Sequence, residues 1–157
     1  MLTGGIARLT AVHFSKGACT SQLGGAIYAA EESDVHVTRA VFEECSGLTG
    51  GGIWAENSQI RLTGCIFDKT KSLSHGGGGI YASGCDPVEI TDTRFDGCKA
   101  EDTDHGGDAL DLEQCDNILI TGTQFEPFDE IRTMWFDTSW LSTIGGCGEY
   151  PCEKGHS

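Results

Sequence analysis

Apolar and polar residues alternate in short stretches along most of this chain. In Ile27-Tyr28-Ala29 and Val35-His36-Val37, every second side chain is apolar, which is the period of a β-strand with one buried face. Apolar residues at the helical spacing of i, i+3 and i+4 are missing, whereas β-branched residues are frequent. The pattern therefore predicts an all-β chain built from short strands.

These stretches belong to a sequence repeat. An aliphatic residue and a Thr are followed, four positions after the Thr, by a Phe in five copies, whose phenylalanines are Phe14, Phe42, Phe67, Phe95 and Phe125. A glycine-containing segment with an aliphatic residue precedes four of the copies, at 24–27, 51–53, 78–80 and 107–110. Three short strands in each repeat are typical of one coil of a parallel β-helix, in which every coil pairs with its neighbours. We therefore expect a parallel β-helix of about five coils over residues 1–128, followed by an irregular aromatic tail, 129–157, that caps the helix or docks on a partner.

Two motifs of the repeat resemble those of a known family. Gly-Gly-Ala-Ile at 24–27 is echoed by Gly-Gly-Gly-Ile at 50–53 and 77–80, and Phe-x-x-Cys occurs at 42–45 and 95–98. Together they resemble the alternating GGAI and FxxN repeats of chlamydial polymorphic outer-membrane proteins, with Cys where that family has Asn. The resemblance implies a right-handed parallel β-helix of the pectate-lyase-like superfold. It also implies adhesion or surface display through a solenoid, without catalysis.

The charge of the chain argues against some partners. Among 157 residues, 24 Asp and Glu outweigh 10 Lys and Arg, for a formal net charge of −14. Nucleic acid and anionic membranes are therefore not expected as partners, because both require a basic surface. We expect neither a transmembrane helix, which needs about 18 consecutive apolar residues, nor a signal peptide. The length suits a single domain.

The eight cysteines are the next candidates for chemistry. No Cys-x-x-Cys pair is present, which argues against a zinc site. Cys85 and Cys115 occupy equivalent places in adjacent repeats, so stacking brings them within disulfide distance, and both a disulfide and a pair of buried thiols fit. Cys147 and Cys152 could close a small loop by a disulfide, whereas Cys65 should be a buried free thiol. An oxidising compartment is favoured, as for a secreted protein, a cell surface or an organelle lumen, although the sequence leaves the localisation unknown.

The acidic residues cluster near the end of the repeats. Between Ala100 and Ile131 there are ten Asp or Glu and no Lys or Arg. Calcium prefers oxygen ligands, so Asp102, Asp104 and Asp108 could hold one calcium ion at a corner loop. A solvated acidic face is the alternative. No cofactor is expected, and calcium is the ion that this cluster suggests.

His75 and His105 form a second candidate metal site. Each lies five residues before the aliphatic landmark of its repeat, so stacking should bring the two imidazoles together near the acidic loop. Two histidines and a carboxylate can bind a transition metal. Two solvated loop histidines are the alternative interpretation.

Polysaccharide cleavage is the main catalytic alternative, since a pair of carboxylates on one face of a β-helix could carry it out. In Asp108-Ala109-Leu110-Asp111-Leu112 the leucines take the inward face, so Asp111 and Glu113 face outward near Asp108. These three carboxylates are the candidates for a lyase or hydrolase. No further motif of a pectin-active enzyme is present, so the sequence favours a protein without catalysis.

Ice binding is a second alternative. A Thr recurs once in each repeat, and Thr91-x-Thr93 and Thr121-x-Thr123 suggest a second column of threonines. This second column fails in the earlier repeats. A threonine ladder that satisfies hydrogen bonds at a corner is the simpler explanation.

The two ends of the predicted solenoid suggest where a partner binds. The tail could cap the last coil or dock on a partner through its aromatic residues Trp135, Phe136, Trp140 and Tyr150. No cap is recognised at the N-terminal end, where open strand edges would invite pairing. We therefore expect a non-catalytic structural or protein-interaction β-helix, either a subunit of a larger assembly or a fragment of an adhesin-like surface protein. Its protein partner would bind at the open N-terminal end or at the aromatic tail.

Overall fold

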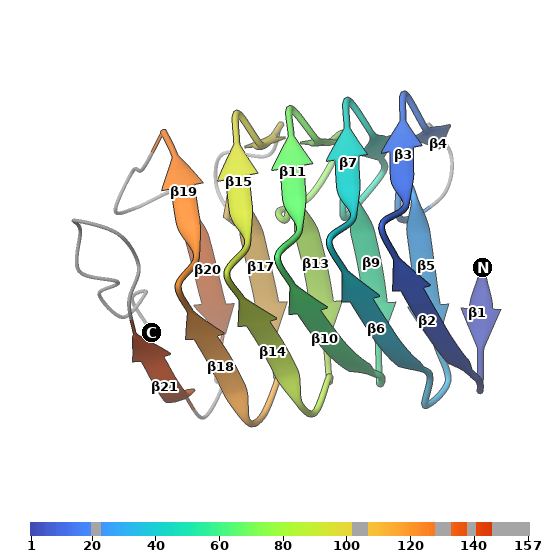
Figure 1. The fold of residues 1–157 in the computed structure, drawn as a ribbon, viewed down its shortest axis with the longest axis vertical. Helices are drawn as coiled ribbons and strands as arrows, with labels where there is room; N and C mark the ends of the chain where they lie inside the picture. Colours follow the sequence, from blue (N-terminus) through green and yellow to red (C-terminus); the bar gives the residue numbers. More distant parts are fainter. Residues whose placement is uncertain (20–22, 102–106, 128–132, 138–140, 146–157) are drawn as a thin grey trace.

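The computed structural model describes residues 1–157 except 20–22, 102–106, 128–132, 138–140 and 146–157. The described residues form 21 β-strands and no helix. The strands lie in four parallel sheets, and successive strands along the chain belong to successive sheets. The chain therefore coils repeatedly around one axis (Figure 1), and the predicted parallel β-helix is confirmed.

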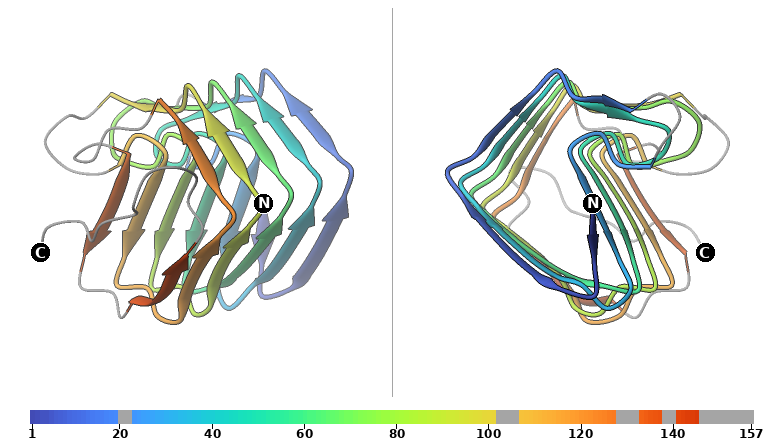
Figure 2. Two further views of the ribbon diagram at one scale, coloured as in Figure 1. Left: turned by 60° about the vertical axis from the view of Figure 1, so that its left-hand side comes forward. Right: turned by 90° about the vertical axis from the view of Figure 1, so that its right-hand side faces the viewer.

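Each coil passes through the four sheets in turn. In the second coil, β5 (Ile27–Ala30) lies in the first sheet, β6 (Asp34–Thr38) in the second, β7 (Val41–Glu43) in the third and β8 (Ser46–Gly47) in the fourth. The fifth coil has strands in the first three sheets within the described residues. Figure 2 shows the coils nearly superimposed in the view along the axis, with the segment between β12 (Lys71–Ser72) and β13 (Ile80–Ser83) projecting from the body.

The remaining strands repeat this order. The first sheet contains β1 (Leu2–Thr3), β5, β9 (Ile53–Glu56), β13 (Ile80–Ser83), β17 (Leu110–Glu113) and β20 (Met134–Asp137). The second sheet contains β2 (Ile6–Thr10), β6, β10 (Gln59–Thr63), β14 (Val88–Thr91), β18 (Ile118–Thr121) and β21 (Leu141–Gly145). The third sheet contains β3 (His13–Ser15), β7, β11 (Ile66–Asp68), β15 (Arg94–Asp96) and β19 (Gln124–Glu126). The fourth sheet contains β4 (Ala18–Cys19), β8, β12 (Lys71–Ser72) and β16 (Lys99–Ala100).

A ladder of stacked phenylalanine rings runs through the core. The rings share one inward position of the third sheet, with neighbouring centroids 4.4–5.1 Å apart and planes within 14° of each other. Aliphatic residues of the first and second sheets stack in the same way, because in-register parallel strands place equivalent side chains one above the other. The landmarks that define the sequence repeat are thus columns of the core.

Two features go beyond the sequence pattern. The fourth sheet consists of strands of two residues, which are too short to show an alternation of apolar and polar positions. β20 and β21 pair in parallel with β17 and β18, although the landmarks of the repeat end near residue 128. The solenoid therefore continues into the tail. Within the described part of the chain, no segment forms a helix that could cross a membrane.

Candidate functional site

The carboxylates suggested for polysaccharide cleavage are hydrogen-bonded or buried within the fold. β17 places Asp111 beside Tyr81 of the neighbouring strand, on the outer side of the first sheet. The Tyr81 hydroxyl donates a hydrogen bond of 2.8 Å to Oε2 of Glu113, and burial together with this carboxylate raises the pKa of Tyr81 above its usual value. Asp108 accepts a hydrogen bond of 2.9 Å from the Ala100 amide, which ties its segment to β16. Asp111 is only 2% exposed and Asp108 and Glu113 are half-buried, so the three side chains do not form an open pair of carboxylates on the surface.

The same face of the first sheet carries a column of aromatic rings. Tyr28, Trp54 and Tyr81 follow one another in register, with ring centroids 4.6 and 6.3 Å apart and planes within 16°. Each ring therefore covers the face of the next, and Trp54 is only 6% exposed. A sugar ring stacks on a free aromatic face, which Trp54 does not offer. The column is better suited to stabilising the sheet than to binding a carbohydrate.

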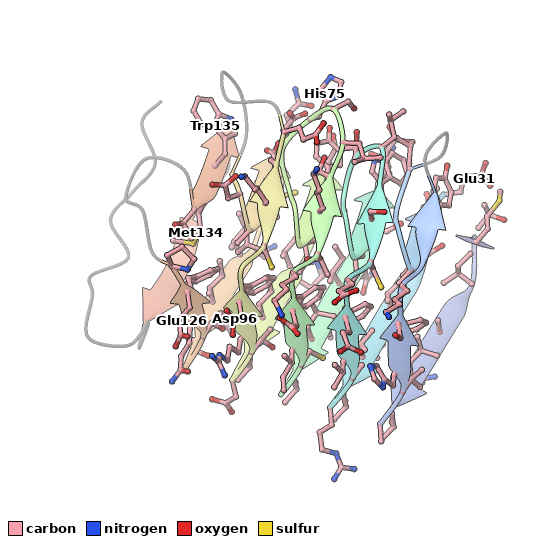
Figure 3. The ribbon with its side chains drawn as sticks, turned by 90° about the horizontal axis from the view of Figure 1, so that it is seen from above. Glu31, His75, Asp96, Glu126, Met134 and Trp135 are labelled. Carbon is pink, nitrogen blue, oxygen red and sulfur yellow. The ribbon has the colours of Figure 1, made fainter. Side chains whose placement is uncertain are left out.

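Most residues suggested for metal binding lie outside the described residues, namely Asp102, Asp104 and His105. His75 is exposed on a projecting segment (Figure 3), where its Nδ1 lies 2.9 Å from the Ser74 hydroxyl. In the part of the chain that the structure describes, no three His, Cys, Asp or Glu side chains gather as metal ligands. The calcium site and the two-histidine site therefore stay predictions.

Cys85 and Cys115 lie one above the other at the corner between the first and second sheets. Both are thiols that no disulfide joins in this structure, and both are fully buried. The Asp116 amide donates to the Cys85 carbonyl at 3.0 Å, which holds the two coils in register at this corner. A hydrogen bond between the thiols lowers the pKa of Cys85 and raises that of Cys115. A disulfide at this place stays a prediction, and Cys147 and Cys152 lie outside the described residues.

The buried cysteines share their corner positions with hydroxyl residues. Ser58, Cys85 and Cys115 form one column, and each donates to the carbonyl two residues earlier, at 2.8, 3.6 and 3.4 Å. A residue with positive φ stands directly before each of them and turns the chain. These turning residues, with φ between 46° and 61°, are Asn57, Gly84 and Gln114. Cysteine therefore serves here as a small buried hydrogen-bond donor, in the role that serine has in other coils.

The corner between the second and third sheets follows the same rule. Cys65, Thr93 and Thr123 donate to the carbonyls two residues earlier, at 3.6, 3.0 and 3.2 Å. All three are buried, and burial raises the pKa of the Cys65 thiol. The second threonine column suggested for ice binding therefore lies inside the solenoid and leaves no flat face with two columns.

The exchange of cysteine for threonine can be tested at Cys65. Cys65→Thr should change the free energy of unfolding by less than about 1 kcal/mol, because the hydroxyl keeps the hydrogen bond to the Thr63 carbonyl. Cys65→Val has the shape of threonine without the donor, so it should lower the free energy of unfolding by about 1 kcal/mol more. Urea denaturation followed by circular dichroism measures both. Equal stability of the two variants would show that this corner does not use the donor.

The tail contributes a strand to the last coils. β20 pairs Trp135 with Asp111, and the adjacent Met134 packs in the hydrophobic core (Figure 3). The tail residues whose side chains lie outside the described part are Phe136, Trp140 and Tyr150. β20 therefore extends the first sheet beyond the repeats, and the use of the tail as a docking surface stays a prediction.

The first coil is the outermost coil of the described residues on the N-terminal side. β1, β2, β3 and β4 are the outermost strands of their sheets, and each pairs with a described strand on one side only (Figure 1). Leu9 and Phe14 pack against the core but remain partly exposed, whereas Val37 and Phe42, their neighbours in the second coil, are buried. Ile6, the first residue of β2, is 61% exposed. This end therefore combines unpaired strand edges with apolar side chains, which favours pairing with another strand.

The outer edge of the first coil presents amides in the arrangement used inside the solenoid. In the second coil, the amides of Asp34 and Val41 donate to carbonyls of the first coil at 2.8 and 2.9 Å. Ile6 and His13 hold the equivalent positions in the first coil. Their amides therefore point to the open side, where no strand lies within the described residues.

The open end also differs from the rest of the solenoid in charge. No Asp or Glu precedes Glu31, whereas Arg8, His13 and Lys16 lie in the first coil. Ser15 begins an outward column of the third sheet that continues with carboxylates in the following coils. These carboxylates are Glu43, Asp68, Asp96 and Glu126, of which Figure 3 labels the last two. The sequence alone contains this asymmetry, but the strand register shows that the basic residues lie along one open end.

Several basic side chains lie beside acidic side chains of a neighbouring coil. Such pairs join His13 to Glu43 at 3.0 Å, Arg61 to Asp34 at 2.8 Å and Arg94 to Glu126 at 2.8 Å. Arg8 is in register with His36 and, like Arg39 and Lys99, has no ion pair in the described part of the chain.

Comparison with known proteins adds no family to these observations. No protein-family model matches the chain, and no curated protein or solved structure matches it either. The candidate site is therefore defined by its own geometry.

Proposed function

We propose that this chain is a non-catalytic β-solenoid that acts as a structural and protein-interaction subunit, with the first coil as its docking end. The observation that carries the proposal is the open edge of β1, β2, β3 and β4, which adjoins the partly exposed Leu9 and Phe14. Such an edge binds another strand through backbone hydrogen bonds, while apolar side chains add contact area. The GGAI-like and Phe-x-x-Cys motifs support a place in a surface assembly of the adhesin kind, in an oxidising compartment.

Polysaccharide cleavage is less well supported by the geometry. A glycosidase needs two carboxylates that reach the sugar, one of them as an acid and the other as a base or nucleophile. Here Glu113 accepts the hydrogen bond of Tyr81, Asp108 accepts that of Ala100, and Asp111 is buried. A protein that assembles through its open coil fits these observations better.

Site-specific photo-crosslinking tests the docking end in cells that produce the protein. A benzophenone amino acid replaces Ile6, and a matched variant carries it at Ile66, an exposed isoleucine of the third sheet in a middle coil. We expect a covalent adduct with one protein from position 6 and none of that adduct from position 66, by mass spectrometry. Adding Phe14→Lys at the rim should reduce the adduct by about tenfold, because it places a charge in the apolar contact.

Either of two results would contradict the proposal. The first is the same set of adducts from both positions. The second is an isolated chain that sediments as a stable monomer and gives no adduct from position 6.

A further inference from the structure

We infer that the docking end binds an acidic, extended segment of a protein partner, which adds to the first coil as one more parallel coil. This inference rests on the proposed function and specifies the class of partner. Three properties of the first coil lead to it: the hydrogen-bonding groups of its outer edge, the apolar side chains at its rim and its charge.

The backbone specifies an extended partner with parallel strands. β2 and β3 are held on one side by β6 and β7, in continuous parallel register. On the other side, the amides of Ile6 and His13 repeat the positions from which Asp34 and Val41 donate to the first coil. A segment with the same spacing of carbonyls would satisfy both amides at once. A helix or a folded surface without a strand edge would leave them unpaired.

The apolar side chains at the rim require alternating apolar and polar residues in the added segment. Leu9 and Phe14 present one side to the core and the other to the open end, where they remain partly exposed. In the middle of the solenoid, the same columns place aliphatic residue on aliphatic residue and ring on ring, with Phe42 and Phe67 at 4.4 Å. The added segment therefore needs apolar residues at the two inward positions, at the spacing that the repeat itself shows.

The charge specifies acidic residues at the outward positions. The first coil carries Arg8 and Lys16 and no carboxylate, whereas its His13 is already paired with Glu43 of the second coil. Arg8 faces outward in the column that contains Arg61 and Glu89. Within that column, Arg61 Nε lies 3.5 Å from Oε2 of Glu89. A carboxylate in the added coil would reach Arg8 in the same way. Opposite charges across a strand pair favour the contact and select the partner.

A second copy of this chain fits less well than a different protein. Two first coils placed face to face would bring the basic residues of one copy toward those of the other. The opposite end of the solenoid is more covered, since Phe125 is only 8% exposed and Met134 is buried, whereas Phe14 at the first coil is partly exposed. Stacking of two copies head to tail would bring acidic residues of the last coils, such as Glu126, toward the first coil, but it would offer little apolar contact on one side.

The experiment uses the full chain and a synthetic peptide of defined sequence. The probe has the sequence of residues 87–97 with the change Arg94→Glu, because β14 and β15 contain the alternation that the added coil needs. In register with the first coil, Glu89 of the peptide lies beside Arg8, and its position 94 lies beside His13. The control peptide keeps Arg94 and carries Glu89→Lys, Asp92→Lys and Asp96→Lys. Binding is followed by amide chemical shifts and by hydrogen exchange.

We expect the acidic peptide to bind with a dissociation constant of about 1 mM or tighter, and to slow hydrogen exchange at the amides of Ile6 and His13. The basic peptide should bind at least about tenfold more weakly. Equal binding of the two peptides, or binding without protection of these two amides, would overturn the inference. An adduct from position 6 in cells together with no peptide binding would leave the docking end in place and reject the acidic strand as its partner.

Variants of the chain separate two contributions to peptide affinity, the backbone hydrogen bonds and the charge of the first coil. Ile6→Pro removes the outward amide at the first residue of β2 and leaves the hydrogen bond that the Gly5 carbonyl accepts from Asp34, so it should abolish peptide binding. Ile6→Ala keeps the amide and should weaken binding by less than about threefold. Arg8→Glu should weaken it by about tenfold, whereas Lys99→Glu, with the same change in net charge far from the open end, should weaken it by less than about twofold. Equal effects of Ile6→Pro and Ile6→Ala would contradict strand addition.

Discussion

Gly51→Ala should lower the free energy of unfolding by about 3 kcal/mol or more. A Cβ at this position would overlap the Gly78 carbonyl oxygen of the next coil and would lie 2.5 Å and 2.6 Å from the backbone N and C of Lys71. All of these are backbone atoms, so no rotation of a side chain can relieve the overlap. Gly51 lies where β12 packs against the start of the first sheet, and the glycine lets the two segments approach.

Gly64→Ala is the matched control for this prediction. Gly64 has a φ of +63°, but the nearest atom to an added Cβ is Arg39 Cγ at 3.6 Å. Other coils place Ala11, Arg39 and Asp92 at the equivalent corner with similar φ. The control should therefore cost about 1 kcal/mol, which is the penalty of a left-handed conformation for a residue with a Cβ. Urea denaturation of both variants decides the matter, and an equal loss of stability would show that backbone crowding at Gly51 is not the cause.

The repeat could be predicted because its landmark residues make the same packing contacts in successive coils. The phenylalanines stack on one another, and the aliphatic residue after the glycines begins β5, β9, β13 and β17 of the first sheet. The Gly-Gly pair has a task that only the structure explains, since Gly51 and Gly78 lie against the strands of the fourth sheet. In the fifth coil, Asp108 takes this place, and no fourth-sheet strand is described for that coil. The fourth sheet escaped prediction because strands of two residues carry no period.

The candidate site was less predictable because it depends on register between distant residues. The hydrogen bond from Tyr81 to Glu113 joins residues 32 positions apart, and it engages a carboxylate that alternation alone would leave available for catalysis. The roles of Cys65 and Cys85 became clear only from their columns, where threonine and serine occupy the same corners. The open end with its basic residues was visible in part, as the absence of a cap and of acids before Glu31.

The repeated architecture also leads us to expect different effects of mutations in the middle coils and in the first coil. Each coil contacts only its two neighbours, so a core residue in the middle loses contacts on two sides when it is truncated. A residue of the first coil has one described neighbour and a partly exposed surface. Mutations in the first coil should therefore lower the free energy of unfolding less than the same mutations in the middle. They should weaken binding of the partner more.

The Phe ladder provides the sharpest test of this division. Phe67→Ala should lower the free energy of unfolding by about 3–5 kcal/mol, because the fully buried ring is stacked between Phe42 at 4.4 Å and Phe95 at 4.7 Å. Phe14→Ala removes the same ring from the first coil, where it contacts Phe42 at 5.0 Å and is partly exposed, so it should cost about 1–2 kcal/mol. Urea denaturation measures both losses.

Binding of the acidic peptide should respond in the opposite order. Phe14→Ala removes an apolar contact at the rim and should weaken the complex by about tenfold. The part of the ring that is exposed in the unbound chain would be buried by the peptide, so its loss reduces the binding free energy. Phe67→Ala, assayed below its unfolding transition, leaves the first coil unchanged and should bind within about twofold of the unaltered chain. A loss of stability at Phe14 as large as that at Phe67 would mean that the first coil is not an open end, and the docking site would have to lie elsewhere.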